Sequence, residues 1–175
     1  MQIFTDGSKS EQGVEAGIAI FIQSKLTQQL RYTLYNRCSK NQAEQLAIVK
    51  TLETIKKSQI NDNVSKTVRV NTDSRITLQS LKNPRNHNYL TEEIEKKAIE
   101  FKKLSWTITF TWIKAHAGMY GKELADNLAK ETARSDDISF NRIPKSEIVQ
   151  QARDQSIAEW QTTYTMTAPN YRRRE

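Results

Sequence analysis

The first part of the chain has the alternating pattern of β-strands. Residues 14–22 predict a strand, with Ala16, Ile18 and Ile20 on one face and Gly17, Ala19 and Phe21 on the other. Shorter apolar runs at residues 3–5 and 30–34 predict a strand before it and another after it. Because only short loops join the three, we expect an antiparallel meander.

Helical patterns alternate with strands in the rest of the chain. Ser39 and Gln42 have the spacing of a capping box, and a wide apolar stripe continues from them to about residue 57. The later elements expected are, in order, a strand at 68–72, a short helix after Ser74, a helix capped by Thr91, a strand at 105–113, a helix from 121 to about 133 and an amphipathic helix at 144–164.

This order of elements predicts an α/β fold. We expect a five-stranded mixed sheet, three antiparallel strands followed by two parallel ones, because helical crossovers make the added strands parallel. Helices flank the sheet, and a further helix forms a C-terminal extension. The polar run at residues 134–137 breaks the pattern, so we place one domain at 1–134 and an extension with a basic tail at 135–175.

Composition indicates the class of binding partner and the cellular location. The chain of 175 residues has 27 Lys and Arg against 20 Asp and Glu, a net charge of +7 that suits a nucleic-acid partner. No apolar run reaches the roughly 20 residues of a membrane span, and residues 1–6 do not resemble a secretory signal. Cys38 is the single cysteine, which excludes an intrachain disulfide and favours an intracellular location, cytoplasm or nucleus.

Four acids occur where the predicted elements could bring them together. Asp6 and Asp73 end strands, while Glu44 and Asp126 lie in first turns of helices. Alone, Asp6 with Gly7 is better explained as a hairpin turn, and Glu44 as a complement to the helix dipole. If all four converge, their repulsion requires a counter-charge, which a hard cation such as Mg²⁺ supplies.

A titratable side chain lies close to the fourth acid. His116 is in a loop of small residues, ten positions before Asp126. An imidazole titrates near neutral pH and can pass protons there. Two Mg²⁺ ions about 3.5–4 Å apart can clamp the attacking and leaving oxygens of a phosphoryl displacement. Together these groups predict a metal-dependent phosphodiesterase site.

Four segments of the sequence resemble the signature blocks of type 1 ribonuclease H. They are Phe-Thr-Asp-Gly-Ser at 4–8, Asn-Gln-Ala-Glu at 41–44, Asn-Thr-Asp-Ser at 71–74, and Trp-Ile-Lys-Ala-His-Ala-Gly at 112–118 with the Asp at 126. They occur in the order of that family, across roughly residues 2–134. The variant looks most like the ribonuclease H domain of non-LTR retrotransposon polyproteins, which follows a reverse transcriptase.

The resemblance implies an endonuclease that cuts the RNA strand of an RNA–DNA hybrid. It implies two Mg²⁺ ions, for which Mn²⁺ can substitute, held by Asp6, Glu44, Asp73 and Asp126. His116 matches a histidine that assists protonation or product release. Substrate contacts are expected at Gly7, Ser8, Asn41, Ser74 and Arg75, although Arg75 is equally well explained as a solvated arginine at a helix start.

The resemblance also bears on partners and on alternative functions. Residues 81–91 are too few for the DNA-gripping helical projection of some family members, so we expect weak hybrid binding by a monomer and help from a reverse transcriptase domain. A non-catalytic nucleic-acid or protein-binding module remains an alternative, and an integrase or resolvase is a more distant one. The complete acid set favours the nuclease.

Overall fold

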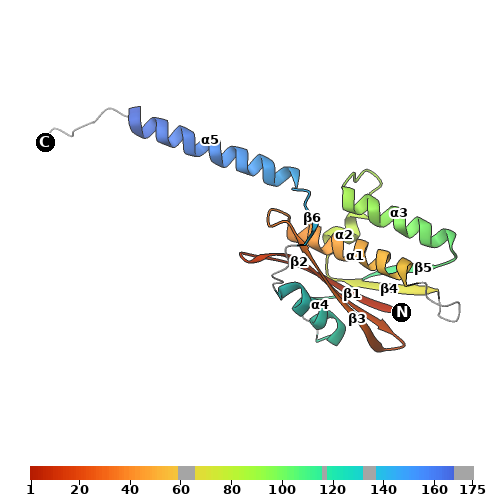
Figure 1. Cartoon of the computed structure of the whole chain (residues 1–175). Coiled ribbons are helices and arrows are strands. Elements are labelled where there is room, and N and C mark those ends of the chain that lie inside the picture. The colour runs from red at the N-terminus through yellow and green to blue at the C-terminus, as the bar shows by residue number, and fades with distance from the viewer. Residues whose placement is uncertain (59–65, 116–117, 132–136, 168–175) are drawn as a thin grey trace. The chain divides into compact units, whose positions relative to one another are not determined.

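The computed structural model describes residues 1–58, 66–115, 118–131 and 137–167, with side chains as far as Tyr164. The chain divides into two compact units, Met1–Arg142 and Ile143–Glu175. The first unit contains a sheet with helices on both faces, and the described part of the second is one long helix (Figure 1).

Six strands form the sheet, in the order β5-β4-β1-β2-β3-β6. Their bounds are Gln2–Ser10 (β1), Gly13–Ile22 (β2), Lys25–Leu34 (β3), Thr67–Thr72 (β4), Thr107–Trp112 (β5) and Ile138–Phe140 (β6). The first three are antiparallel neighbours, and β4 and β5 are added in parallel, as predicted.

The predicted count of five strands is corrected to six. The additional strand, β6, has three residues and pairs in parallel with β3 at the edge of the sheet. A strand this short has no periodicity that a sequence reading can detect. Its pairing extends the compact unit beyond residue 134, as far as Arg142.

The described part of the chain contains five helices. They are Lys40–Lys57 (α1), Arg75–Ser80 (α2), Tyr89–Lys103 (α3), Tyr120–Lys130 (α4) and Lys145–Thr167 (α5). Helices α1 and α3 lie over one face and α4 over the other (Figure 1). The two alternating faces of β2 are therefore both buried, which explains why both are apolar or small.

Helix starts were predicted with mixed success. The capping box of Ser39 and Gln42 is confirmed, with the Ser39 hydroxyl accepting from the Gln42 amide and the Gln42 side chain from the Ser39 amide. The predicted cap at Thr91 is wrong. The Asn88 side chain caps α3 instead, and Thr91 is fully buried in the first turn.

Strand β1 is longer than predicted. It continues through Asp6, which pairs with Gly17 of β2, to Ser10. The hairpin turn therefore falls at residues 11–12, and the interpretation of Asp6 with Gly7 as the turn is wrong. Asp6 is held within a paired strand, a more rigid position than the strand end expected for it.

Candidate active site

Parallel pairing of β1 with β4 places Asp6 and Asp73 side by side. Residues Gln2, Ile3 and Phe4 of β1 lie opposite Arg69, Val70 and Asn71 of β4, a constant offset of 67 (69 − 2 = 67). Continued for two more residues, the same offset sets Asp73 beside Asp6 (6 + 67 = 73). Strand β4 ends at Thr72, so Asp73 lies outside the strand pairing that orients Asp6.

Helix α1 brings the third acid to this pair. Glu44 is the fifth residue of α1, beyond the first turn where it was expected, and only 8% of its surface is exposed. Gly7 makes the approach possible, because a Cβ there would lie 2.5 Å from the Glu44 backbone nitrogen. Oxygen atoms of Asp6, Glu44 and Asp73 lie within 4.8 Å of one another.

The fourth acid reaches the same place from the opposite face of the sheet. Asp126 is the seventh residue of α4, again beyond the predicted first turn, and it lies close enough to Asp6 to raise the pKa of that carboxyl. It lines a small hollow together with Asp73 and Ala115. The predicted convergence is thus observed as a buried triad with Asp126 at its margin.

A lysine that sequence reasoning did not single out lies among these acids. The Lys122 Nζ atom is 2.7 Å from an Oδ1 atom of Asp6 and 2.7 Å from an Oδ1 atom of Asp73. Lys122 is four residues before Asp126 in α4, and residues i and i+4 share one helix face. That spacing is the signal that could have identified it.

Burial controls the electrostatics of the acids. It raises the pKa of Asp6, against the opposing effect of Lys122, and Asp73 and Asp126 raise it further. Burial also raises the pKa of Glu44, while the hydrogen bond from Ser74 and the charge of Lys40 act in the opposite direction. Both carboxylates are therefore costly to ionise, a cost that a divalent cation would offset.

We predict that Glu44→Gln stabilises the metal-free protein at neutral pH. The pKa of Glu44 is raised in the folded state, so its contribution to stability is complete at low pH and is lost as the pH rises through that pKa. Glutamine avoids this loss and keeps an acceptor for Ser74. The melting temperature in EDTA should exceed that of the wild type at pH 7 and differ little at pH 4. A lower melting temperature at pH 7 would contradict this electrostatic account.

Each predicted substrate contact lies within three residues of one of the acids along the chain. Gly7 and Ser8 continue β1 past Asp6, and the Asn41 side chain accepts a hydrogen bond from Thr77. Ser74 caps α2 and is buried. Arg75 is exposed, and its guanidinium lies 4.3 Å from the centre of the Trp112 ring, whose Nε1 donates to the Asp73 carbonyl. Sequence reasoning did not predict this link between Trp112 and Asp73.

One predicted site residue falls outside the described residues. His116 belongs to the loop between β5 and α4, of which residues 116–117 are not described. The loop starts after Ile113, which is buried, and reaches Ala115 in the hollow beside Asp126. The described part of the loop therefore passes the acid cluster.

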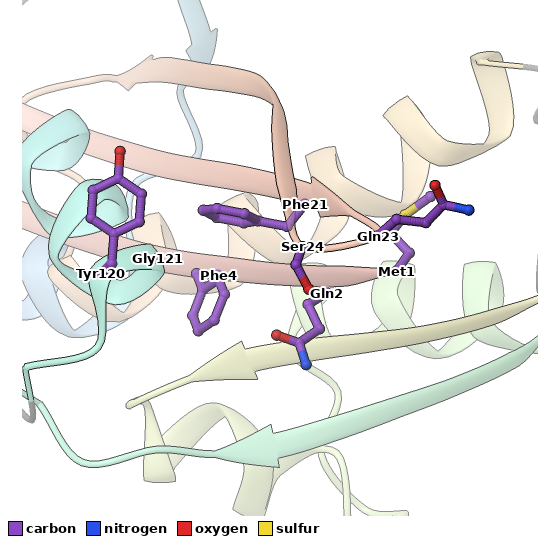
Figure 2. A pocket seen from close by; sticks show the side chains of 8 residues that line it. All are labelled: Met1, Gln2, Phe4, Phe21, Gln23, Ser24, Tyr120 and Gly121. Atoms are coloured by element: carbon purple, nitrogen blue, oxygen red, sulfur yellow. The ribbon is translucent and has the colours of Figure 1, made fainter.

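A separate hollow lies beside the start of α4 (Figure 2). Its volume is about 390 Å³, and it is lined by Met1, Gln2, Phe4, Phe21, Gln23, Ser24, Tyr120 and Gly121. Phe21 packs edge-on against both Phe4 and Tyr120. None of the predicted site residues lines it, and no side chain in its lining is a carboxylate.

Comparison with known proteins agrees with this geometry. The family model for RNase H matches residues 1–134, which include all four acids. The chain belongs to the RNase H family. Its match covers the sheet strands β1 to β5 and helices α1 to α4, the elements that carry the site.

Two bacterial relatives of this RNase H family member are named Ribonuclease H. The protein of Pseudoalteromonas translucida (strain TAC 125) is 25% identical over 154 residues, covering 79% of this chain and 92% of the relative. That of Vibrio campbellii (strain ATCC BAA-1116) is 26% identical over 151 residues, covering 77% and 90%. The similarity therefore extends over nearly the whole of each relative.

A solved structure shares the fold. The crystal structure of RNase H1 from the halophilic archaeon Halobacterium salinarum NRC-1 has a TM-score of 0.52 and 16% sequence identity, over 73% of this chain and 92% of that one. This confirms the ribonuclease H-like α/β architecture predicted from the sequence. Among the described helices, none is long and apolar enough to cross a bilayer.

Proposed function

We propose that this RNase H family member hydrolyses the RNA strand of RNA–DNA hybrids endonucleolytically, using two Mg²⁺ ions. The observation that carries the proposal is the convergence of Asp6, Glu44 and Asp73 within 4.8 Å, with Asp126 close enough to raise the pKa of Asp6. The intact acid set supports a nuclease over a non-catalytic binding module. Carboxylate oxygens are also the ligands that Mg²⁺ prefers, so the residues fit the metal.

The proposed roles follow from position. Asp6, Glu44, Asp73 and Asp126 would hold the two ions, with Mn²⁺ as a substitute. When bound, the ions would supply a hydroxide near neutral pH and neutralise charge on the scissile phosphate. Pairing in β1 holds Asp6 in a fixed orientation, and the capped start of α1 does the same for Glu44. His116 would assist proton transfer to the leaving group or product release.

Recognition of the RNA strand would come from groups around the acids. RNA is distinguished from DNA by contacts to 2′-hydroxyls in a wide, shallow minor groove. We propose that Gly7, Ser8, Asn41 and Ser74 make such contacts. Arg75, stacked on Trp112, presents a guanidinium at the same edge of the sheet and would contact a phosphate.

The biological setting stays a prediction. We propose residues 1–134 as the catalytic domain and 135–175 as an extension, working intracellularly as a monomer beside a reverse transcriptase domain of a retrotransposon polyprotein. The connection between α2 and α3, residues 81–88, contains no helix. A domain without a DNA-gripping projection there would depend on a neighbour for tight binding, which supports this setting.

The proposal predicts strict substrate and metal requirements. Labelled RNA–DNA hybrid, double-stranded RNA and double-stranded DNA would each be incubated with the full chain in Mg²⁺, in Mn²⁺ and in EDTA. We expect internal cuts in the RNA strand of the hybrid alone, with 3′-hydroxyl and 5′-phosphate ends, and no product in EDTA. Equal cleavage of double-stranded RNA, or cleavage that persists in EDTA, would contradict the proposal.

A further inference from the structure

The Lys122 side chain bridges two acids of the cluster, Asp6 and Asp73. Only 3% of the residue is exposed, and its ammonium lies between the carboxylates of Asp6 and Asp73. The third acceptor is the Thr5 carbonyl oxygen, at 3.1 Å. Since an ammonium has three donors, all of them are used, and the group is held as a fixed internal cation.

Other lysines near the acids are placed differently. Lys130 pairs with Asp126 and Lys40 with Glu44, but the side chains of both lysines are more than half exposed. Exposed pairs of this kind are screened by water and readily broken. Lys122 is the buried one of the three, and it contacts the two acids that strand pairing sets side by side.

We infer that Lys122 is a built-in competitor for the divalent cation at the Asp6–Asp73 position. The inference rests on the proposed metal site. An ion shared by the same two Oδ1 atoms would need metal–oxygen distances of about 2.0–2.1 Å and would overlap the space of the ammonium. Two cations cannot share that space, so the metal enters only when the lysine leaves.

The structure makes such a displacement feasible. The four-carbon stem of lysine is flexible, so its ammonium can swing outward while α4 stays docked. The hollow lined by Lys122, Glu123 and Asp126 lies directly beside it. Without metal, Lys122 compensates the acids and keeps the site folded. With metal, its departure lowers the net affinity, so occupancy follows the concentration of free Mg²⁺.

The chain offers a matched control for testing this inference. Lys97 also bridges two carboxylates, Glu53 at 3.2 Å and Glu93 at 3.8 Å, but it lies on α3, away from the acid cluster. Lys122→Met and Lys97→Met therefore remove the same charge and the same kind of bridge. Asp73→Asn reports whether the measured binding belongs to this site.

Calorimetric titration of the full chain with MnCl₂ and with MgCl₂ would compare the variants. We expect Lys122→Met to bind metal about tenfold more tightly or better, since removal of a nearby unit charge favours a second cation. Lys97→Met should match the wild type, and Asp73→Asn should bind far more weakly. By thermal melting, Lys122→Met should be less stable than the wild type in EDTA and gain more stability from metal.

The outcomes separate this inference from the proposed function. Metal binding by the wild type with no gain in Lys122→Met would overturn the inference alone. Absence of binding by the wild type would overturn the metal chemistry and the inference together.

If Lys122→Met does not fold, nuclear magnetic resonance of the wild type can test whether metal displaces Lys122. The protected ¹⁵N signal of the Lys122 ammonium should disappear on saturation with Mg²⁺, and its persistence would overturn the inference.

Discussion

Asp73→Asn should reduce Mg²⁺-dependent hydrolysis of the RNA strand by roughly 10³-fold or more, because charge stabilisation by a bound metal contributes several kcal/mol to the transition state. The substitution keeps the size of the side chain and an Oδ1 atom that can accept from Lys122. Asp73 follows β4 and makes no ladder hydrogen bond. The variant should therefore fold, and initial rates on labelled hybrid would measure the loss.

The control for Asp73→Asn is the same chemical change outside the compact unit that holds the cluster. Asp154 of α5 accepts a hydrogen bond from Gln150 and belongs to the other compact unit. Asp154→Asn should keep the wild-type rate, and circular dichroism should show equal helix content in both variants. A folded Asp73→Asn chain within tenfold of the wild-type rate would refute the role of Asp73 as a metal ligand.

The parts of the fold that were predicted correctly have local causes. The apolar and small residues on both faces of β2 reflect its burial on both sides. The capping box of Ser39 and Gln42 marks the start of α1. The parallel addition of β4 and β5 follows from their helical crossovers. By contrast, β6 is defined by its pairing with β3 across about 100 residues of chain, and no local pattern specifies it.

The acids of the candidate site could be predicted from the sequence, but Lys122 could not. Asp6, Glu44 and Asp73 could be placed together because strand order and helix position bring them to one edge. The position of the Lys122 ammonium depends on how closely α4 packs on the sheet, which is a tertiary property. Burial of a lysine is rare without a partner, so its pairing with Asp6 and Asp73 became evident only in three dimensions.

Gly17→Ala should destabilise the protein by about 3 kcal/mol or more, the upper part of the range for overpacking. A Cβ at Gly17 would lie 2.2 Å from the Ala125 carbonyl oxygen and 2.7 Å from the Ala129 nitrogen. Both are backbone atoms of α4, so no side-chain rotation relieves the clash and the helix must move. For a chain of this length the melting temperature should fall by roughly 6–12 °C.

The same displacement should impair the site, because α4 carries both Lys122 and Asp126 while Gly17 lies opposite Asp6. A misplacement of about 1 Å can cost a rate of about 10²-fold, so the folded variant should cleave hybrid correspondingly more slowly. Gly13→Ala in the same strand is the control for crowding: the nearest atom to a new Cβ is 3.7 Å away, so any cost there comes from its φ of +159° and not from a clash. The cost of Gly13→Ala should be smaller than that of Gly17→Ala, because no helix has to move. A Gly17→Ala chain that loses stability yet keeps the full rate per folded molecule would show that the acid cluster does not depend on close docking of α4.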